Sequence, residues 1–219
     1  MNQDMQEIVK KFRIVTENPG DYSRVWKKEK NRPVVVFAMF RWFHPVVRTY
    51  VCATSLDNSQ VVASRNGKVR WQPRTSALQW KPLPKARLPG KARPNRLVQM
   101  RHIARRFSGE VSDHPVADRT TMKRLRLLPQ PIYRYSSDAV DGAIFAFASG
   151  TNPAVLLCLE GDLSPKTVGW RYGLARRWSF ESRMEYENEE IWTAPSVRPR
   201  TNSDAPYYLA VIPEEAAAE

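Results

Sequence analysis

The stretch VDGAIFAFASGTNPAVLLCLEG, residues 140–161, decides the fold class that the sequence predicts. Two apolar runs flank the tetrapeptide Gly-Thr-Asn-Pro at 150–153. Such runs favour strands, and glycine, asparagine and proline favour a tight reversal of the chain. The stretch therefore predicts a β-hairpin whose turn serves as scaffold, with Thr151 and Asn152 as the two turn residues that could contact a partner.

The chain before this hairpin contains further strand-forming sequence and one clear helix. Residues 33–73 hold several β-branched and aromatic runs, and two of them flank Asn66-Gly67, a dipeptide typical of two-residue hairpin turns. The helix begins near Pro94-Asn95, where Asn95 is the predicted N-cap. Its predicted apolar stripe consists of Leu97, Met100, Ile103, Ala104 and Phe107.

These elements predict a mainly β (β+α) fold, in which antiparallel meanders form a sandwich or barrel-like core. The fold includes the central amphipathic helix and a short N-terminal helix at residues 3–15. The predicted divisions are an N-terminal helix plus first β-meander at 1–73, a Pro-rich basic connector at 74–94, the central helix plus second β-meander at 95–213, and a tail at 214–219.

The two predicted meanders share a weak similarity. When residues 34–51 are aligned with 142–159, four of the 18 positions are identical, and both segments run as strand, turn ending in proline, strand. The second meander is then either a repeat related to the first or part of one continuous domain with it. Any two hairpins share part of this pattern, because strands resemble one another.

The composition is that of a globular protein, with 42% hydrophobic and 26% charged residues among 219. No apolar run approaches the roughly 20 residues of a membrane helix, and the first residues lack the apolar core of a signal peptide. Cys52 and Cys158 lie in apolar runs, which predicts two buried thiols. We expect a cytoplasmic protein that does not bind membranes; the sequence does not indicate an oligomeric state.

The charge is concentrated in the middle of the chain. The net charge is +13, and residues 65–126 contain 17 Lys and Arg against only three acidic residues. The remainder of the chain carries 18 basic and 19 acidic residues, so the whole basic excess lies in this middle segment. A basic block of this size bears on partners and association, not on the fold.

The basic block contains the predicted binding residues. Lys and Arg neutralise phosphates, and aromatic rings stack on unpaired bases. We therefore predict a polyanion-binding protein with nucleic acid as the favoured ligand, bound with low sequence specificity; the alternative is an acidic protein partner in a larger assembly. The polyanion-binding candidates are Arg101, Arg105 and Arg106 on the helix, Lys123, Arg124 and Arg126 on a strand, and Lys91 and Arg93 in the connector. The stacking candidates are Trp71, Trp80 and Tyr133.

The sequence carries no recognisable catalytic or metal-binding motif, and we predict no catalytic residue, metal site or cofactor. Its three His and two Cys form no CxxC, HxH or HExxH pattern. It also lacks a GxSxG nucleophile turn and a Gly-rich phosphate loop. If the protein is an enzyme of an unrecognised type, Asp141, Glu185 and Glu187 are its candidate acids and bases.

Three segments carry a resemblance to a known group of proteins: LRLLPQPIYRY at 125–135, DGAIFAFASGTNPAVLLCLE at 141–160 and WRYGLAR at 170–176. Together they resemble a group of uncharacterised bacterial proteins common in planctomycetes. The resemblance extends over about 95–195 and, less clearly, over the first meander. It implies a bacterial origin and a recurring domain, and it implies no activity.

Overall fold

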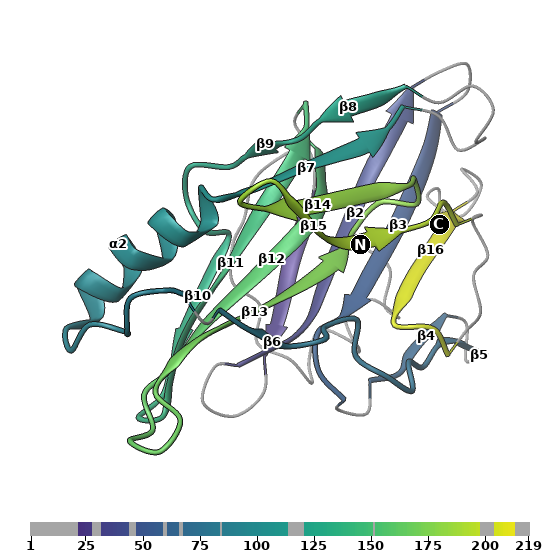
Figure 1. Cartoon of the computed structure of the whole chain (residues 1–219). Helices are drawn as coiled ribbons and strands as arrows, with labels where there is room; N and C mark the ends of the chain where they lie inside the picture. Colours follow the sequence, from purple (N-terminus) through teal and green to yellow (C-terminus); the bar gives the residue numbers. More distant parts are fainter. Residues whose placement is uncertain are drawn as a thin grey trace. The chain divides into compact units, whose positions relative to one another are not determined.

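The computed structural model in Figure 1 has a mainly β, antiparallel fold, as predicted. The chain divides into two compact units, residues 1–77 with 198–219, and residues 78–197. The predicted N-terminal helix at 3–15 lies outside the described residues. The described residues are 22–27, 32–43, 47–58, 61–65, 68–83, 85–113, 121–150, 152–197 and 204–212.

The first unit contains a four-stranded sheet in the order β1-β2-β3-β16 and a separate hairpin, β4-β5. The pairing of Phe43 with Val47 and of Arg65 with Lys68 confirms both predicted hairpins. Val35 and Trp71 belong to its buried core. The strands are β1 (Tyr22–Lys27), β2 (Pro33–Phe43), β3 (Val47–Ser55), β4 (Ala63–Arg65), β5 (Lys68–Trp71) and β16 (Tyr207–Ile212).

Strand β16 joins the first unit, whereas the sequence grouped residues 206–213 with the second meander. It pairs with β3, with Leu209 opposite Cys52. The Trp71 indole N–H donates to the carbonyl of Ala205 at 2.7 Å, which ties the segment before β16 to the same core. Local sequence carries no signal for such a pairing, because the partner strand lies about 150 residues earlier in the chain.

The strand pairing does not support the internal repeat. Phe37 lies opposite Ala53, whereas Phe145, its aligned counterpart, lies opposite Leu157. The alignment would require Gly161 at that position. The two hairpins therefore differ in register by four residues in the segment where the identities occur.

The second unit is a two-layer sandwich with one helix (Figure 1). One layer is a six-stranded sheet in the order β10-β11-β12-β13-β6, with β9 pairing β11, and the other is a four-stranded sheet in the order β15-β14-β7-β8. Side chains of both layers and of α2 form one buried core, which includes Phe145, Leu157 and Met184. The elements are β6 (Lys81–Pro82), α2 (Arg93–Ala104), β7 (Phe107–Ser112), β8 (Met122–Arg124), β9 (Arg126–Leu127), β10 (Tyr133–Ser136), β11 (Val140–Ser149), β12 (Asn152–Asp162), β13 (Gly169–Arg176), β14 (Ser182–Tyr186) and β15 (Glu189–Ala194).

The hairpin that opened the sequence analysis forms β11 and β12, but its turn is shorter than predicted. Ser149 pairs with Asn152, so Asn152 and Pro153 belong to β12 and not to the turn, and Thr151 lies outside the described residues. Gly150 has a positive φ of 60°, which suits glycine. Pro153 lies inside β12 opposite Ala148, where the register shifts. Proline has no N–H to donate, so an irregularity at this place in the ladder is expected.

The predicted central helix is present, but its ends differ from the prediction. Asn95 is not the N-cap: Ala92 precedes the first turn without a side-chain cap, and Pro94 lies within that turn. Proline is favoured there because the first N–H groups have no partner inside the helix. The helix ends before Phe107, which begins β7. Met100, Ile103 and Ala104 are buried against the sandwich, as the stripe predicted.

The connector between the two meanders packs against the second unit from Leu78 onward. Strand β6 pairs with β13, and the Leu83 N–H donates to the carbonyl of Trp170 at 2.8 Å. The Trp170 indole N–H in turn donates to the carbonyl of Arg87 at 2.8 Å. The backbone of the Pro-rich segment is thus hydrogen-bonded to the edge of the sandwich at β13.

Candidate functional site

Residues 78–109 form the most one-sided charge segment of the second unit. They include nine Lys and Arg and no Asp or Glu. Any carboxylate partner for these cations must therefore come from another part of the chain. The structure shows which of the cations find such a partner and which do not.

Arg96 points into the unit, because it lies four residues before Met100 and seven before Ile103, on the buried face of α2. Its Nε donates to Oδ2 of Asp141 at 2.6 Å, and Asp141 is fully buried. Arg134 lies on the other side, with its Nη2 at 3.1 Å from the same oxygen. Asp141, one of the acids considered for catalysis, is thus enclosed by two guanidinium groups. The same Arg96 donates from Nη1 to the carbonyls of Gly90 and Lys91 at 3.0 and 2.6 Å.

Gln99 fixes the connector alongside α2. Its Nε2 donates to the carbonyl of Leu88 at 2.9 Å, and its Oε1 accepts from the N–H of Gly90 at 2.8 Å. Figure 1 shows the connector running beside α2 at one end of the second unit. A groove of about 260 Å³ lies between the two segments. It is lined by Ala86, Arg87, Gln99, His102, Ile103 and Arg106.

Five cations of this segment are exposed and have no ion pair or side-chain hydrogen bond with any described residue. Together with the exposed His102 they lie on the connector and on α2, and we call this set the cationic edge. It consists of Lys85, Arg87, Lys91, Arg93, His102 and Arg105. The edge includes three of the eight predicted polyanion-binding residues.

The two other predicted residues near α2, Arg101 and Arg106, form side-chain contacts with other residues. Arg101 donates to Oε1 of Gln130, a neutral group that leaves the charge of Arg101 uncompensated. Arg106 forms an ion pair with Glu187, and its guanidinium carbon lies 4.8 Å from the ring centre of Tyr186. The bonds to Glu187 use Nε and Nη2. Nη1 of Arg106 makes no hydrogen bond with a described residue.

The remaining predicted cations lie on β8 and β9, away from α2 (Figure 1). Lys123 has an ion pair with Asp113 at 3.5 Å, and Arg124 lies opposite the exposed Glu110 in the β7–β8 ladder. Arg126 approaches the carbonyl of Gly150 at 3.5 Å. The eight predicted residues therefore do not form one surface, because β8 and β9 lie away from the connector and α2 (Figure 1).

The aromatic residues predicted to stack on bases are largely engaged inside the protein. Trp71 is only 1% exposed and belongs to the core of the first unit, so its ring is not accessible to a base. Tyr133 is half-buried and stacked on Tyr135, with ring centres 6.0 Å apart, and burial raises its pKa. Trp80 is half-buried, with the guanidinium of Arg171 4.9 Å from its ring centre.

A polar row that was not predicted from the sequence crosses the six-stranded sheet. Tyr135 pairs with Gly142, Gly142 with Glu160, and Glu160 with Arg171 on successive strands. The Tyr135 hydroxyl donates to the fully buried Glu160 at 2.7 Å, and Nε of Arg171 donates to its other oxygen at 2.8 Å. A Cβ on Gly142 would lie 2.7 Å from the Tyr135 hydroxyl oxygen, so glycine leaves room for the ring to cross β11.

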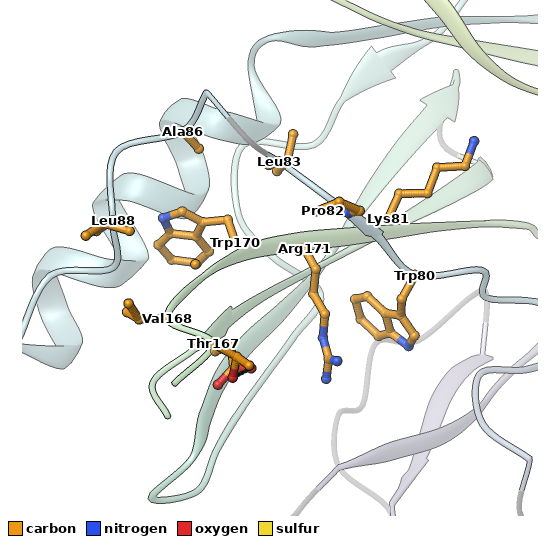
Figure 2. A pocket seen from close by; sticks show the side chains of 12 residues that line it. Trp80, Lys81, Pro82, Leu83, Ala86, Leu88, Thr167, Val168, Trp170 and Arg171 are labelled. Carbon is orange, nitrogen blue, oxygen red and sulfur yellow. Dashed lines mark hydrogen bonds between the residues drawn. The ribbon is translucent and has the colours of Figure 1, made fainter. Parts of the chain in front are cut away.

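A second hollow of about 420 Å³ lies around β6 (Figure 2). Figure 2 shows Trp170 grouped with Ala86 and Leu88 toward the helix, and Arg171 with Trp80 at the other end. Its one carboxylate, Asp162, accepts hydrogen bonds from the Thr167 hydroxyl at 2.7 Å and from the Ser164 N–H at 2.9 Å. These bonds lower the pKa of Asp162, so its ionised form is favoured and it is not suited to act as a general acid at neutral pH.

The other candidate acids are exposed and carry surface contacts. Glu185 accepts from the Ser108 hydroxyl at 3.1 Å, and Glu187 is the ion-pair partner of Arg106. Among the described residues, no group of three His, Cys, Asp or Glu side chains is placed to hold a metal ion. Within the same residues, no helix is long and apolar enough to cross a membrane.

Comparisons with known proteins identify no relative. No family model matches the chain, and neither the curated proteins nor the solved structures give a significant match. The resemblance to a planctomycete-type family therefore stays a prediction, and a function has to be inferred from the geometry of the chain itself.

Proposed function

We propose that this chain is a non-enzymatic binding protein that engages a polyanion through the cationic edge, with nucleic acid as the favoured ligand. The observation that carries the proposal is the set of five exposed Lys and Arg on two adjoining segments, none paired with a carboxylate of the described chain. Exposed cations without such partners keep their full charge for an external anion. The proposal includes the cytoplasmic location expected from the sequence.

The mechanism follows from the charges and from the placement of the aromatic rings. Lys and Arg neutralise phosphates and release condensed counterions, which gives affinity without reading the sequence. Trp71 is buried, and Tyr133 is stacked on a neighbouring ring, so base stacking contributes little. This placement favours binding to the phosphate backbone with low sequence specificity.

The direct test is a salt series with the purified full chain and a labelled duplex of mixed sequence, followed by fluorescence anisotropy. Five phosphate contacts predict a plot of log K against log salt with a slope of about −4 to −5. Two duplexes of different sequence should bind with similar affinity. No binding at an ionic strength of about 50 mM, or a slope near zero, would reject the proposal.

A second candidate function, binding of an acidic protein in a larger assembly, is favoured by a different observation. Leu88 and Val98 lie among the cations of the connector and α2 and are 59% and 50% exposed. Apolar side chains next to unpaired charges suit a partner that offers both apolar and carboxylate groups. Purifying the native complex separates the two functions: an acidic protein without nucleic acid favours the assembly role.

A further inference from the structure

We infer that the groove between the connector and α2 is the phosphate-binding subsite of the cationic edge. The inference rests on the proposed function and gives it a specific location. The groove of about 260 Å³ can hold a phosphate group together with bound water. Three residues in its lining, Arg87, His102 and Arg106, can donate hydrogen bonds to a phosphate oxygen.

The helix side of the groove follows from helical periodicity. Gln99, His102, Ile103 and Arg106 are spaced i, i+3, i+4 and i+7, so they lie on one face, although Arg106 follows the last helical residue. This face is turned toward the connector, which contributes Ala86 and Arg87. The lining thus combines the apolar side chains of Ala86 and Ile103 with polar donors.

The connector side is held in place by hydrogen bonds to its backbone. Gln99 donates to the carbonyl of Leu88 and accepts from the N–H of Gly90. The indole N–H of Trp170 donates to the carbonyl of Arg87 at 2.8 Å. Arg96 donates to the carbonyls of Gly90 and Lys91. A site that is built before the ligand arrives avoids part of the ordering cost of binding.

The charge of the groove favours an anion. None of its lining residues is acidic. Arg87 is exposed and forms no ion pair with a described residue. The Glu187 contact uses Nε and Nη2 of Arg106, which leaves its Nη1 without a described partner. Glu187 thereby orients Arg106, and Tyr186 supports its guanidinium plane. A phosphate oxygen can accept from Arg87, from His102 and from this remaining nitrogen of Arg106.

The test compares two variants that each remove one positive charge from the same exposed segment. Arg87→Gln changes a residue of the groove, and Lys85→Gln changes a residue outside it. With the labelled duplex we expect Arg87→Gln to weaken binding about tenfold and Lys85→Gln less than threefold. Equal losses would overturn the subsite and leave the polyanion function intact.

Inorganic phosphate provides a second readout that does not depend on nucleic acid. In a titration of the full chain followed by NMR, the His102 imidazole signal, assigned with His102→Gln, should shift and saturate. The same titration of Arg87→Gln should require about tenfold more phosphate. A shift that persists unchanged in Arg87→Gln, or no shift in the wild type, would overturn the inference. If phosphate binds as expected but the duplex does not bind, the result rejects the proposed function instead.

Discussion

The connector with α2 and the β7–β8 edge are both rich in Lys and Arg, yet their charges are arranged differently. On the first, five cations are exposed without a described carboxylate partner. On the second, Lys123 meets Asp113 at 3.5 Å, and Arg124 lies opposite Glu110. The difference teaches that a basic sequence becomes an anion-attracting surface only where the tertiary neighbours carry no carboxylates.

The same contrast exists within the first region, between the inside and the outside of the unit. Arg96 and Arg134 surround the buried Asp141, whereas Arg93 and Arg105 are exposed. Buried charges require partners, because an isolated ion loses its hydration without compensation. We therefore expect the two kinds of cation to separate in experiments, with the buried ones affecting stability and the exposed ones affecting binding.

The largest effect is expected from removing the buried carboxylate. Asp141→Ala leaves the buried Arg96 and its neighbour Arg134 without their counter-charge. We expect the free energy of unfolding to fall by about 3–5 kcal/mol, the cost of breaking a buried ion pair from one side. Urea unfolding followed by circular dichroism measures this loss.

Asp138→Ala is the matched control for that experiment. Asp138 lies three residues earlier in the chain, is exposed, and makes no ion pair with a described residue. Its removal changes the net charge equally but should alter the unfolding free energy by no more than about 0.5 kcal/mol. Similar losses for both variants would show that the buried cluster is not a special source of stability.

Local sequence was sufficient to predict the elements whose structure is set locally. The predicted Asn66-Gly67 hairpin is an example, because β4 and β5 pair with Arg65 opposite Lys68. Two-residue hairpin turns in general need backbone conformations that few residues adopt, so an Asn-Gly dipeptide is a strong sequence signal. The pairing of β16 with β3 was missed because it depends on distant residues.

The candidate site was predictable in part. The concentration of cations at 78–109 is visible in the sequence, but the ion pair of Arg96 is not, because its partner Asp141 lies 45 residues later in the chain. A usable signal was present in the strands: Glu160 ends the apolar run LLCLE, where an exposed position is not expected. A charged residue in such a run predicts a buried partner, here Arg171 and Tyr135.

The second largest effect is expected on duplex affinity, when charges are removed from one or the other of the two basic regions. Lys91→Gln with Arg93→Gln removes two charges from the cationic edge, and Lys123→Gln with Arg124→Gln removes two from β8. We expect the first pair to weaken duplex binding about tenfold or more and to reduce the salt slope by about two. The second pair should weaken it less than threefold, because Asp113 and Glu110 already offset those charges.

Both double variants should unfold within about 0.5 kcal/mol of the wild type, since all four side chains are exposed. Unfolding curves thus serve as the control for the anisotropy measurements. Equal losses of affinity in the two double variants would mean that the net charge of the whole chain governs binding, and the distinction between the two regions would not hold.

The smallest effect is expected at Asp162. This carboxylate forms no ion pair with the described cations of the connector, α2 or the β7–β8 edge and is held by hydrogen bonds instead. The Thr167 hydroxyl and the Ser164 N–H lower its pKa below the value of 3.8 expected in the unfolded chain. The ionised form therefore stabilises the fold fully above that value, and the contribution disappears as the pH falls through the lower folded-state pKa. We expect Asp162→Asn to lower the free energy of unfolding by roughly a few tenths of a kcal/mol at pH 7 and by progressively less toward pH 3. Urea unfolding at several pH values measures this loss. Thr167→Val should show the same pH dependence, and a cost that stays constant across this range would assign the effect to packing instead.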